Sequence, residues 1–500
     1  MTVSCTTDAL VDISADILVL FLPVDPPAPI LSALESALDL SLTAAAADLN
    51  DTPGHRRTLY PDDSLAADRV VLVGLGTTDD LDADALRQAG AGAAKAGHDA
   101  DATSLALLLP DADIDDAPVA QALTEGVILG GYRYRTYKTD EDPPSLDALH
   151  LHPGDARDAD AVTQGGKRGM AMAQAACTAR DLVNRSPHDK TATLLAEAIQ
   201  ESGAAHGYDV ETWTRDRIEA ENFGGLLAVN QGSLEPPTFS VLSWTPEDAL
   251  NERPIVLVGK GVVFDTGGLS LKSTKNSMDF MKSDMGGAAA VIGAFEALAD
   301  LDLPLRVLGL VPATDNRPGQ NAYVPGDVVT MHSGATVEVM NTDAEGRLLV
   351  ADALSYAKRY DPELVIDLAT LTGAQVMALG SDAAAVMTSE TDGAAERLYA
   401  LQRAGERCGE RVHPLPMYDA YRKHLDSDVA DIKNVGGREA GCITAGKFLE
   451  HFVAFPWLHL DIAGPAFLHS EKPYRPKGGT GFGARLLATY LSDLVAARHA

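Results

Sequence analysis

Cysteine is scarce in this chain, with four residues among 500. Cys5, Cys177, Cys408 and Cys442 lie far apart, and no CxxC pair occurs. A disulfide framework needs many cysteines, and a thiolate zinc site needs closely spaced ones. The sequence therefore predicts neither, and it favours a reducing compartment.

Two further absences concern export and membranes. The first fifty residues contain neither Lys nor Arg, so the basic segment that begins a signal peptide is missing. The apolar run ILVLFLP (17–23) is too short to span a bilayer, and it predicts a buried strand instead. We expect a cytoplasmic protein that does not bind membranes.

Positive charge is the third shortage. The chain has 40 Lys and Arg residues against 72 Asp and Glu, which gives a net charge of −32 and a pI near 4.6. Such a field repels phosphate backbones and anionic lipids, so nucleic-acid and membrane partners are disfavoured. Asp predominates among the acids and Lys is scarce, a pattern that suits high salt. Ordinary acidic solubility explains it equally well.

The length and the pattern of apolar runs predict two α/β domains. Five hundred residues exceed what one hydrophobic core serves, and short apolar strands alternate with Ala-rich helices. We predict a smaller N-terminal α/β domain (1–161), a connecting helix (162–184) and a larger α/β domain (185–500). Continuous apolar runs such as PIVLVG (254–259) and LVIDLAT (364–370) predict a mostly parallel central sheet in the larger domain, flanked by helices.

The stretch NTDAEGRL (341–348) is strongly polar between a predicted strand (335–340) and a predicted helix. Thr342 and Glu345 fit a capping box, which is a common way to begin a helix. That hypothesis leaves Arg347 unexplained, because the helix dipole disfavours a cation in the first turn. Taken alone, the stretch is consistent with either a cap or a functional site.

Two more acidic residues lie at similar positions. Asp265 in GKGVVFDTGGLSLK (259–272) lies between an apolar residue and a glycine pair, where a carboxylate would be partly buried and would need a partner. A phosphate-binding loop is excluded, because Gly, and neither Ser nor Thr, follows Lys260. Asp284 directly precedes a predicted helix, where helix capping is the simpler interpretation.

Considered together, the four carboxylates suggest a site for divalent metal ions, which none of them indicates alone. Asp265, Asp284, Asp343 and Glu345 are predicted to follow strands of one sheet, whose carboxyl ends gather ligands. The chain has no HExxH and no GxSxG motif. Oxygen-rich sites suit Mn²⁺, Mg²⁺ or Zn²⁺, and two such ions about 3.5–4 Å apart can activate water and polarise a carbonyl together.

Quoted together, these stretches resemble the leucyl aminopeptidase family of two-metal peptidases (the M17 type). NTDAEGRL matches the signature octapeptide of that family, and GKGVVFDTGGLSLK and MKSDMGGAAAV match its metal-binding segments. The other matching segments are DNRPGQNAYVPGDVV (315–329), ATLTGA (369–374), ADIKNVGGREAGCITAGKFLEHF (430–452), HLDIAGPA (459–466) and GGTGFGARLL (478–487). EGVILGGYRYRTYK (125–138) resembles the first domain of the family more weakly.

The resemblance implies a role for each matching position. The residues that would hold one divalent ion are Lys260, Asp265, Asp284 and Glu345, and those for the other are Asp265, Asp343 and Glu345. A lysine ligand must bind as the neutral amine, which requires the ion to depress its pKa. Lys272 would stabilise the oxyanion, and Arg347 would hold a bicarbonate ion that acts as general base. The positions that would line the pocket for the first side chain are Met281, Thr370, Gly373, Ala463 and Ala466.

The implied activity is removal of the N-terminal residue, preferably Leu or another apolar residue, from peptides with a free N-terminus. Two divalent ions per subunit, Mn²⁺ or Zn²⁺, would hold the attacking hydroxide between them. The resemblance also implies a homohexamer, a dimer of trimers, with its active sites facing an interior cavity.

Two other functions are weighed against this one. A peptidase-fold protein with a mainly binding or regulatory role is disfavoured by the complete ligand set, and binding of DNA is disfavoured by the charge of −32. A two-metal hydrolase of phosphate esters would need a cationic clamp beyond Lys272 and Arg347. Ser273, where the family commonly has proline, and the loosely matching NRSPHDKTAT (184–193) leave loop shape and substrate preference open.

Overall fold

The computed structural model describes residues 1–61, 65–389 and 391–499, which form two compact units. The first unit comprises Met1–Gln174 with Ser470–Pro476, and the second comprises Ala175–His469 with Lys477–Ala500. The chain passes from one unit to the other within the long helix α5 (Ala159–Asn184). The division into 1–161, 162–184 and 185–500 stays a prediction.

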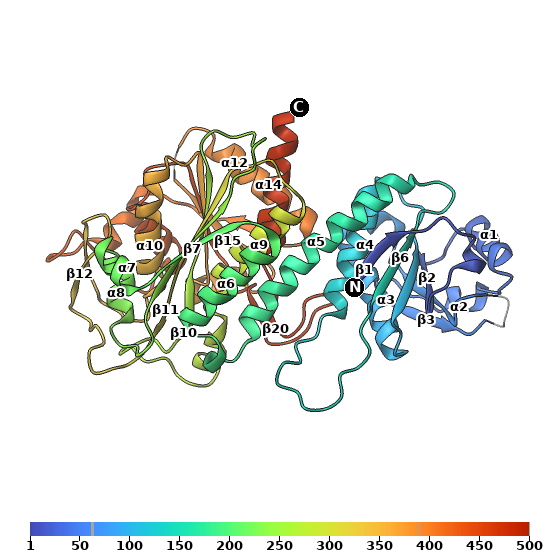
Figure 1. The fold of residues 1–500 in the computed structure, drawn as a ribbon, viewed down its shortest axis with the longest axis horizontal. Helices are drawn as coiled ribbons and strands as arrows, with labels where there is room; N and C mark the ends of the chain where they lie inside the picture. The colour runs from blue at the N-terminus through green and yellow to red at the C-terminus, as the bar shows by residue number, and fades with distance from the viewer. Residues whose placement is uncertain (62–64, 390, 500) are drawn as a thin grey trace. The chain divides into compact units, whose positions relative to one another are not determined.

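A mixed sheet forms the centre of the first unit (Figure 1). Among the described residues it has six strands in the order β1-β6-β5-β2-β4-β3, and only the β3–β4 pair is antiparallel. The strands are β1 (Thr2–Cys5), β2 (Ile17–Leu22), β3 (Arg56–Leu59), β4 (Arg69–Gly74), β5 (Ser104–Leu108) and β6 (Ala148–His152). The run ILVLFL of β2 is apolar throughout because alternate residues face two separate cores.

Helices cover both faces of this sheet. Apolar residues of α3 (Ala83–Asp99) and α4 (Asp116–Gly131) fill the core on one face, and those of α1 (Ala28–Leu38) and the short α2 (Thr43–Ala47) fill the other. The layered α/β architecture predicted for the smaller domain is confirmed.

The second unit is built on a larger sheet, which has nine strands among the described residues. Eight follow the order β16-β15-β18-β14-β9-β11-β8-β7, and β10 pairs with β11. The strands are β7 (Asp209–Trp213), β8 (Thr238–Trp244), β9 (Ile255–Gly259), β10 (Gly261–Asp265), β11 (Val307–Asn316), β14 (Leu364–Ala369), β15 (Ala384–Thr388), β16 (Val412–Pro414) and β18 (Trp457–Asp461). The centre of the sheet is parallel, as predicted.

Alternate residues of the central strands again face two cores. Ile255 and Leu257 of β9 pack into one, and Val256 and Val258 pack into the other. The helices on the first side are α5, α6 (Ala192–His206), α9 (Gly286–Asp300), α12 (Ala394–Cys408) and α14 (Ala484–His499). Those on the second side are α7 (Arg215–Ala220), α8 (Gly224–Asn230), α10 (Gly346–Ala357) and α13 (Gly441–Glu450). Helix α11 (Gly373–Leu379) follows β14.

The strand predicted over 335–340 lies outside the large sheet. It forms the short β13 (Thr336–Glu338), which pairs with β12 (Val328–Thr330) and β17 (Ile432–Lys433) in a separate small sheet. Only its middle residue is buried, whereas a central parallel strand is buried throughout. The expectation that NTDAEGRL follows a strand of the main sheet was therefore wrong. A further pair joins β19 (Phe467–Leu468) to β20 (Gly478–Gly479).

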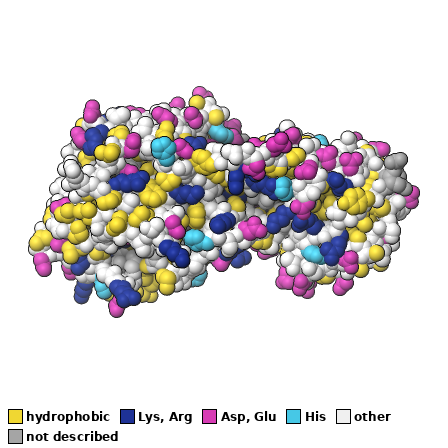
Figure 2. All heavy atoms as spheres, turned by 90° about the horizontal axis from the view of Figure 1, so that it is seen from below, with side chains coloured by type: hydrophobic (Ala, Val, Ile, Leu, Met, Phe, Trp, Pro, Cys, Tyr) yellow, Lys and Arg dark blue, Asp and Glu magenta, His cyan; other side chains and the backbone are white. Residues whose placement is uncertain are grey.

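The acidic side chains do not gather in one place on the face that Figure 2 presents. Figure 2 shows Asp and Glu side chains scattered over the face it presents, with Lys and Arg side chains between them. On this face the net charge of −32 is therefore not one acidic patch. Among the described residues, no helix combines the length and the apolarity that crossing a bilayer requires.

Candidate metal centre and active site

Three buried carboxylates meet in the second unit. Asp265, Asp284 and Glu345, called here the acidic triad, each offer an oxygen that lies within 4.8 Å of the others. Their exposed fractions are 2%, 4% and 2%. Because a buried carboxylate is costly without a partner, three in one place require nearby positive charge.

Different elements place the members of the triad. Asp265 is the last residue of β10, and its Oδ1 accepts hydrogen bonds from Gly267 N at 2.7 Å and Asn316 Nδ2 at 2.8 Å. Asp284 ends the 3-10 helix η4 (Met278–Ser283), and Glu345 directly precedes α10. The prediction that all the carboxylates follow strands of one sheet holds only for Asp265.

Two lysines supply charge to these carboxylates. The Nζ of Lys260 lies 2.7 Å from Asp284 Oδ1 and 3.0 Å from Glu345 Oε1. The Nζ of Lys272 lies 2.8 Å from Asp265 Oδ2 and also contacts the carboxylate of Asp343. The structure thus brings together the five predicted metal ligands and Lys272. Four carboxylates and two ammonium groups give a formal charge of −2, so the cluster is short of positive charge.

The pKa values of the four carboxylates reflect the shortage of positive charge in the cluster. Burial, with neighbouring carboxylates, raises the pKa of Asp265 well above its usual value and that of Asp284 to about 7. Burial also raises the pKa of Asp343. For Glu345, the two lysines outweigh the effect of burial and lower the pKa. Protons occupy part of this cluster near neutral pH unless another cation replaces them.

The donor atoms of the cluster are chemically suited to a divalent ion. Asp284 Oδ2 is buried without a hydrogen-bond partner, although it lies within a set of charged groups. An ion held by carboxylate oxygens would satisfy this atom and supply the missing charge. Such donors suit Mn²⁺, Mg²⁺ or Zn²⁺.

Arg347 lies at the second position of α10, with 6% of its surface exposed. Its Nη1 donates to Asn434 O at 2.7 Å, but its buried Nε has no partner. Burial lowers its pKa to about 10, so the guanidinium is still charged at pH 7. A buried guanidinium with an unused donor is suited to hold an anion.

The helix-capping hypothesis for NTDAEGRL was wrong. The hydroxyl of Thr342 donates to Gly267 O at 2.7 Å and accepts from Ser270 N at 2.8 Å, and no side chain caps α10. Thr342 therefore joins the octapeptide to the loop that follows Asp265. Asp284 does not cap α9 with its side chain either, because that side chain is bound to Lys260 and Thr370.

Three of the residues predicted to line the substrate pocket, Met281, Thr370 and Ala466, lie near Asp284. Thr370 Oγ1 donates to Asp284 Oδ1 at 2.7 Å, and Asp284 N donates to Met281 O at 3.1 Å. A Cβ built on Gly286 would lie 3.3 Å from both Thr370 and Ala466, which places these two together. Gly373 begins α11 with open space at its Cα, and Ala463 N donates to Asp461 Oδ1 at 3.2 Å.

Asn316 and Asn434 are supporting residues that sequence reasoning did not single out. Asn316 Nδ2 donates to Asp265 and to Thr342 O at 2.9 Å, and Asn434 positions Arg347 through its carbonyl. Both lie in segments that carried the family resemblance. That was the only available signal, since nothing in the local pattern shows which side chain an asparagine contacts.

Gly346 lies between Glu345 and Arg347 in the chain, and the structure leaves no space for a side chain at this position. A Cβ at this position would lie 2.3 Å from Lys260 Cε and 2.5 Å from its Nζ. We expect Gly346→Ala to push the Lys260 amine away from Asp284 and Glu345. The predicted cost is about 1–3 kcal/mol of stability from overpacking and a fall in activity of about 10²-fold from displacing a reacting group.

The measurement is thermal unfolding together with kcat/KM for a leucyl anilide. Gly131→Ala is the matched control, because its added Cβ would meet its nearest neighbour, Ala94, at an ordinary 3.8 Å. Wild-type turnover by Gly346→Ala would contradict a role for the Lys260 amine.

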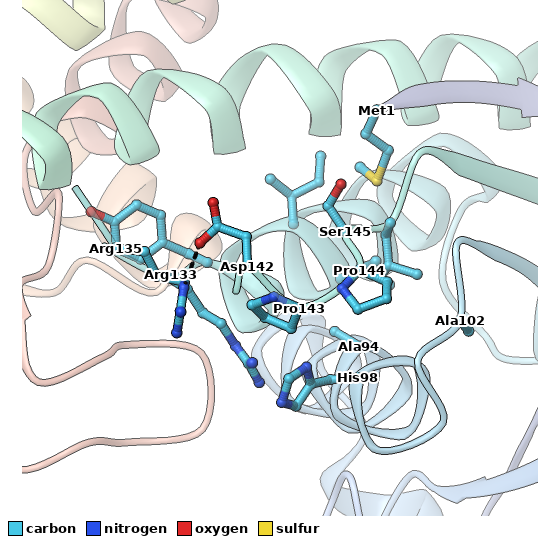
Figure 3. Close-up of a pocket in the computed structure, with 15 residues that line it drawn as sticks. Met1, Ala94, His98, Ala102, Arg133, Arg135, Asp142, Pro143, Pro144 and Ser145 are labelled. Atoms are coloured by element: carbon cyan, nitrogen blue, oxygen red, sulfur yellow. Dashed lines mark hydrogen bonds and ion pairs between the residues drawn. The ribbon is translucent and has the colours of Figure 1, made fainter. Parts of the chain in front are cut away.

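A cavity of about 460 Å³ lies in the first unit and is lined by residues of that unit (Figure 3). Its lining includes His98, Arg133 and Arg135. The guanidinium of Arg135 is already neutralised by Asp140 at 3.0 Å and Asp142 at 2.7 Å. Arg135 therefore does not mark an anion site.

Comparisons with known proteins find matches to both parts of the chain. Residues 26–141 match the model of the cytosol aminopeptidase family, N-terminal domain, and residues 177–488 match that of its catalytic domain. Probable cytosol aminopeptidases from Roseiflexus castenholzii and Chlorobium luteolum are 45% and 42% identical. The first comparison covers 87% of this chain and 89% of the relative, and the second covers 98% and 99%.

A solved structure, the bottromycin maturation enzyme BotP in complex with Mn, has a TM-score of 0.85 and 35% identity. It is matched over 96% of this chain and 100% of that one. The resemblance seen in the motifs is thus confirmed over both domains. The chain belongs to the cytosol aminopeptidase family, of the M17 type, and is a metal-dependent aminopeptidase.

Proposed function

We propose that this aminopeptidase removes Leu and other apolar residues from peptides with a free N-terminus, using two divalent ions per subunit. The observation that carries the proposal is the acidic triad with its unpartnered Asp284 Oδ2, beside the Lys272 ammonium. One ion would be held by Lys260, Asp265, Asp284 and Glu345, and the other by Asp265, Asp343 and Glu345. Manganese is supported by the similar BotP structure, which is a complex with Mn, and zinc is the alternative.

The ions would supply Lewis acidity, which polarises the scissile carbonyl, binds the free amine and lowers the pKa of water. The protein supplies the remaining charges. Asp265 and Glu345 offer oxygens within 4.8 Å of each other and pair with different lysines, Lys272 and Lys260, which supports a role for both carboxylates at both ions. Asp284 pairs with Lys260, and Asp343 pairs with Lys272.

Lys272 is proposed to stabilise negative charge on the substrate. As the scissile carbonyl becomes tetrahedral, its oxygen gains charge, and a fixed cation there lowers the barrier. Burial lowers the pKa of Lys272, but Asp265, Glu345 and Asp343 outweigh burial and raise it. Without metal, the Lys272 ammonium therefore keeps its proton, and the role proposed for it is electrostatic.

Arg347 is proposed to hold a bicarbonate ion, whose chemistry at this place is that of a general base. Its buried Nε is a donor without a partner, and its guanidinium is charged. Met281, Thr370, Gly373, Ala463 and Ala466 are proposed to bind the first side chain of the peptide. Their small or apolar character supports a preference for Leu.

The proposal extends to assembly and location. We propose a homohexamer, built as a dimer of trimers, in the cytoplasm, and this location is supported by relatives named cytosol aminopeptidases. The net charge of −32 supports peptide partners over nucleic acid or anionic membranes.

The test is cleavage of three substrates by the Mn²⁺-loaded protein. A leucyl anilide should be cleaved, whereas an N-acetyl-leucyl anilide should not, because its amine is blocked. A phosphate ester is the third substrate, and its preferential hydrolysis would replace the proposal with the esterase alternative. Equal cleavage of the free and blocked anilides would overturn the exopeptidase assignment.

Metal binding should release protons and should tighten as the pH rises. Without metal, the pKa values of Asp265, Asp284 and Lys260 are all raised, so protons near pH 7 compete with the ion. Fewer protons compete at higher pH, so the apparent affinity for Mn²⁺ should increase between about pH 6 and pH 8. Calorimetry in two buffers of different ionisation enthalpy counts the protons, and an identical heat in both would contradict the prediction.

A further inference from the structure

Lys190, which lies outside the proposed site, is as deeply buried as Lys260 within it. Lys190 lies between the 3-10 helix η3 (Pro187–Asp189) and α6, with 1% of its surface exposed. Among the described residues, no carboxylate forms an ion pair with it. Burial, with Lys282 and Arg185 nearby, lowers its pKa well below the usual value. An apolar side chain of similar volume would fill this space without that cost, so packing alone does not explain a lysine here.

The ammonium group of Lys190 is surrounded by backbone carbonyls. Its Nζ donates to Leu182 O at 3.0 Å, to Val183 O at 3.0 Å and to Lys282 O at 2.6 Å. Three acceptors match the three N–H bonds of a protonated lysine. Two of them belong to the last turn of α5, where the helix leaves its carbonyls without partners and a cation is favoured.

The third carbonyl belongs to a different part of the chain. Lys282 lies in η4, and it follows Lys190 in the chain by 92 positions. The Nζ of Lys282 donates a hydrogen bond to Asn184 O at 3.1 Å. The two lysines thus form two cross-links between the end of α5 and η4. Hydrogen bonds within a 3-10 helix have poor geometry, so a short one depends on such external contacts.

The segment held in this way leads directly into the proposed active site. Met281, which precedes Lys282, is proposed to line the substrate pocket, and Asp284, two residues further on, is a proposed metal ligand. Aromatic contacts also hold η4, since Phe280 stacks on Phe467 with ring centroids 5.9 Å apart and meets His469 edge-on at 4.8 Å. Lys190 therefore supplies the polar attachment on the side of α5.

We propose that Lys190 is a positioning residue of this aminopeptidase. The hydrogen bonds of its buried Nζ fix η4 against the end of α5, and so they set where Met281 and Asp284 lie. The inference rests on the proposed roles of those two residues. Because a displacement of about 1 Å costs up to 10²-fold in rate, losing this attachment should affect both selectivity and metal binding.

The experiment compares the Mn²⁺-loaded wild type with Lys190→Met. We expect kcat/KM for a leucyl anilide to fall about 10- to 100-fold. The ratio of leucyl to alanyl anilide cleavage should fall as well, and the dissociation constant for Mn²⁺ measured by calorimetry should rise. A purely structural role would lower the unfolding temperature but leave the ratio and the dissociation constant of the folded protein unchanged. That result would overturn the proposal.

Lys447→Met is the matched control. It removes another buried lysine of the same unit, paired with Glu450 at 2.8 Å and without a contact to η4, so it should leave the ratio and the Mn²⁺ affinity unchanged. If Lys190→Met does not fold, Lys282→Met decides, because it removes only the return hydrogen bond to Asn184. A smaller shift in the same direction supports the proposal, and no shift overturns it. A wild type without peptidase activity would overturn the proposed function, whereas calorimetry would still test Lys190.

Discussion

Removal of divalent ions with a strong chelator should abolish cleavage of a leucyl anilide and lower the unfolding temperature. The cluster without metal carries four carboxylates against two lysines, and burial raises the pKa of Asp265, Asp284 and Asp343. An ion that binds only the folded protein adds about 2.7 kcal/mol of stability at a hundred times its dissociation constant. Loss of the ions therefore removes both the Lewis acid and this stabilisation.

The measurement pairs anilide cleavage with calorimetric unfolding, before and after Mn²⁺ is added back. The same chelator saturated with Mn²⁺ beforehand is the control for effects unrelated to metal removal. Full activity in protein that elemental analysis shows to be free of metal would rule out the metal-dependent mechanism.

Glu345→Gln should lower kcat/KM at least about 10³-fold, the upper range for loss of one electrostatic group in an active site. Glu345 is the carboxylate proposed to serve both ions, and its pKa is lowered because Lys260 and Lys272 outweigh burial. The amide has the same shape but no charge, so it binds cations far more weakly. The fold should remain, since Glu345 lies at the start of α10 and no side-chain cap is lost.

Glu296→Gln is the matched control for this substitution. Glu296 is also a buried carboxylate of the second unit, with 5% of its surface exposed, and it accepts a hydrogen bond from Ser202 at 2.6 Å. Burial already raises its pKa, so a neutral amide is a mild change there, and activity should be retained. Turnover near the wild-type level in Glu345→Gln would remove Glu345 from the metal site.

The layers of the fold could be predicted because the apolar runs are long and unambiguous. The ILVLFL of β2 and the IVLVG of β9 are buried at every position, and that pattern indicates a parallel strand covered on both faces. The short β13 shows the limit of this approach. Three residues with one buried position could not reveal which sheet they join.

The charged residues of the site could be predicted because they lie in long motifs, but their supports could not. Thr342 looked like a helix cap, since a local pattern shows only local partners. Its actual partners, Gly267 and Ser270, lie more than seventy positions away. Lys190 likewise looked like part of a loosely matching loop, and only its contacts show that it reaches η4.

The two lysines that pair with the acidic triad and Asp343 also bear on how the enzyme folds. Lys260 and Lys272 pair with all four carboxylates, so half of the negative charge of the cluster is balanced by the chain itself. Small metalloproteins in which the ion drives folding remain unfolded until it arrives. This chain instead has two large apolar cores to drive folding of its second unit. We therefore expect these cores to drive folding of the second unit, and the ion to bind a subunit that has already folded.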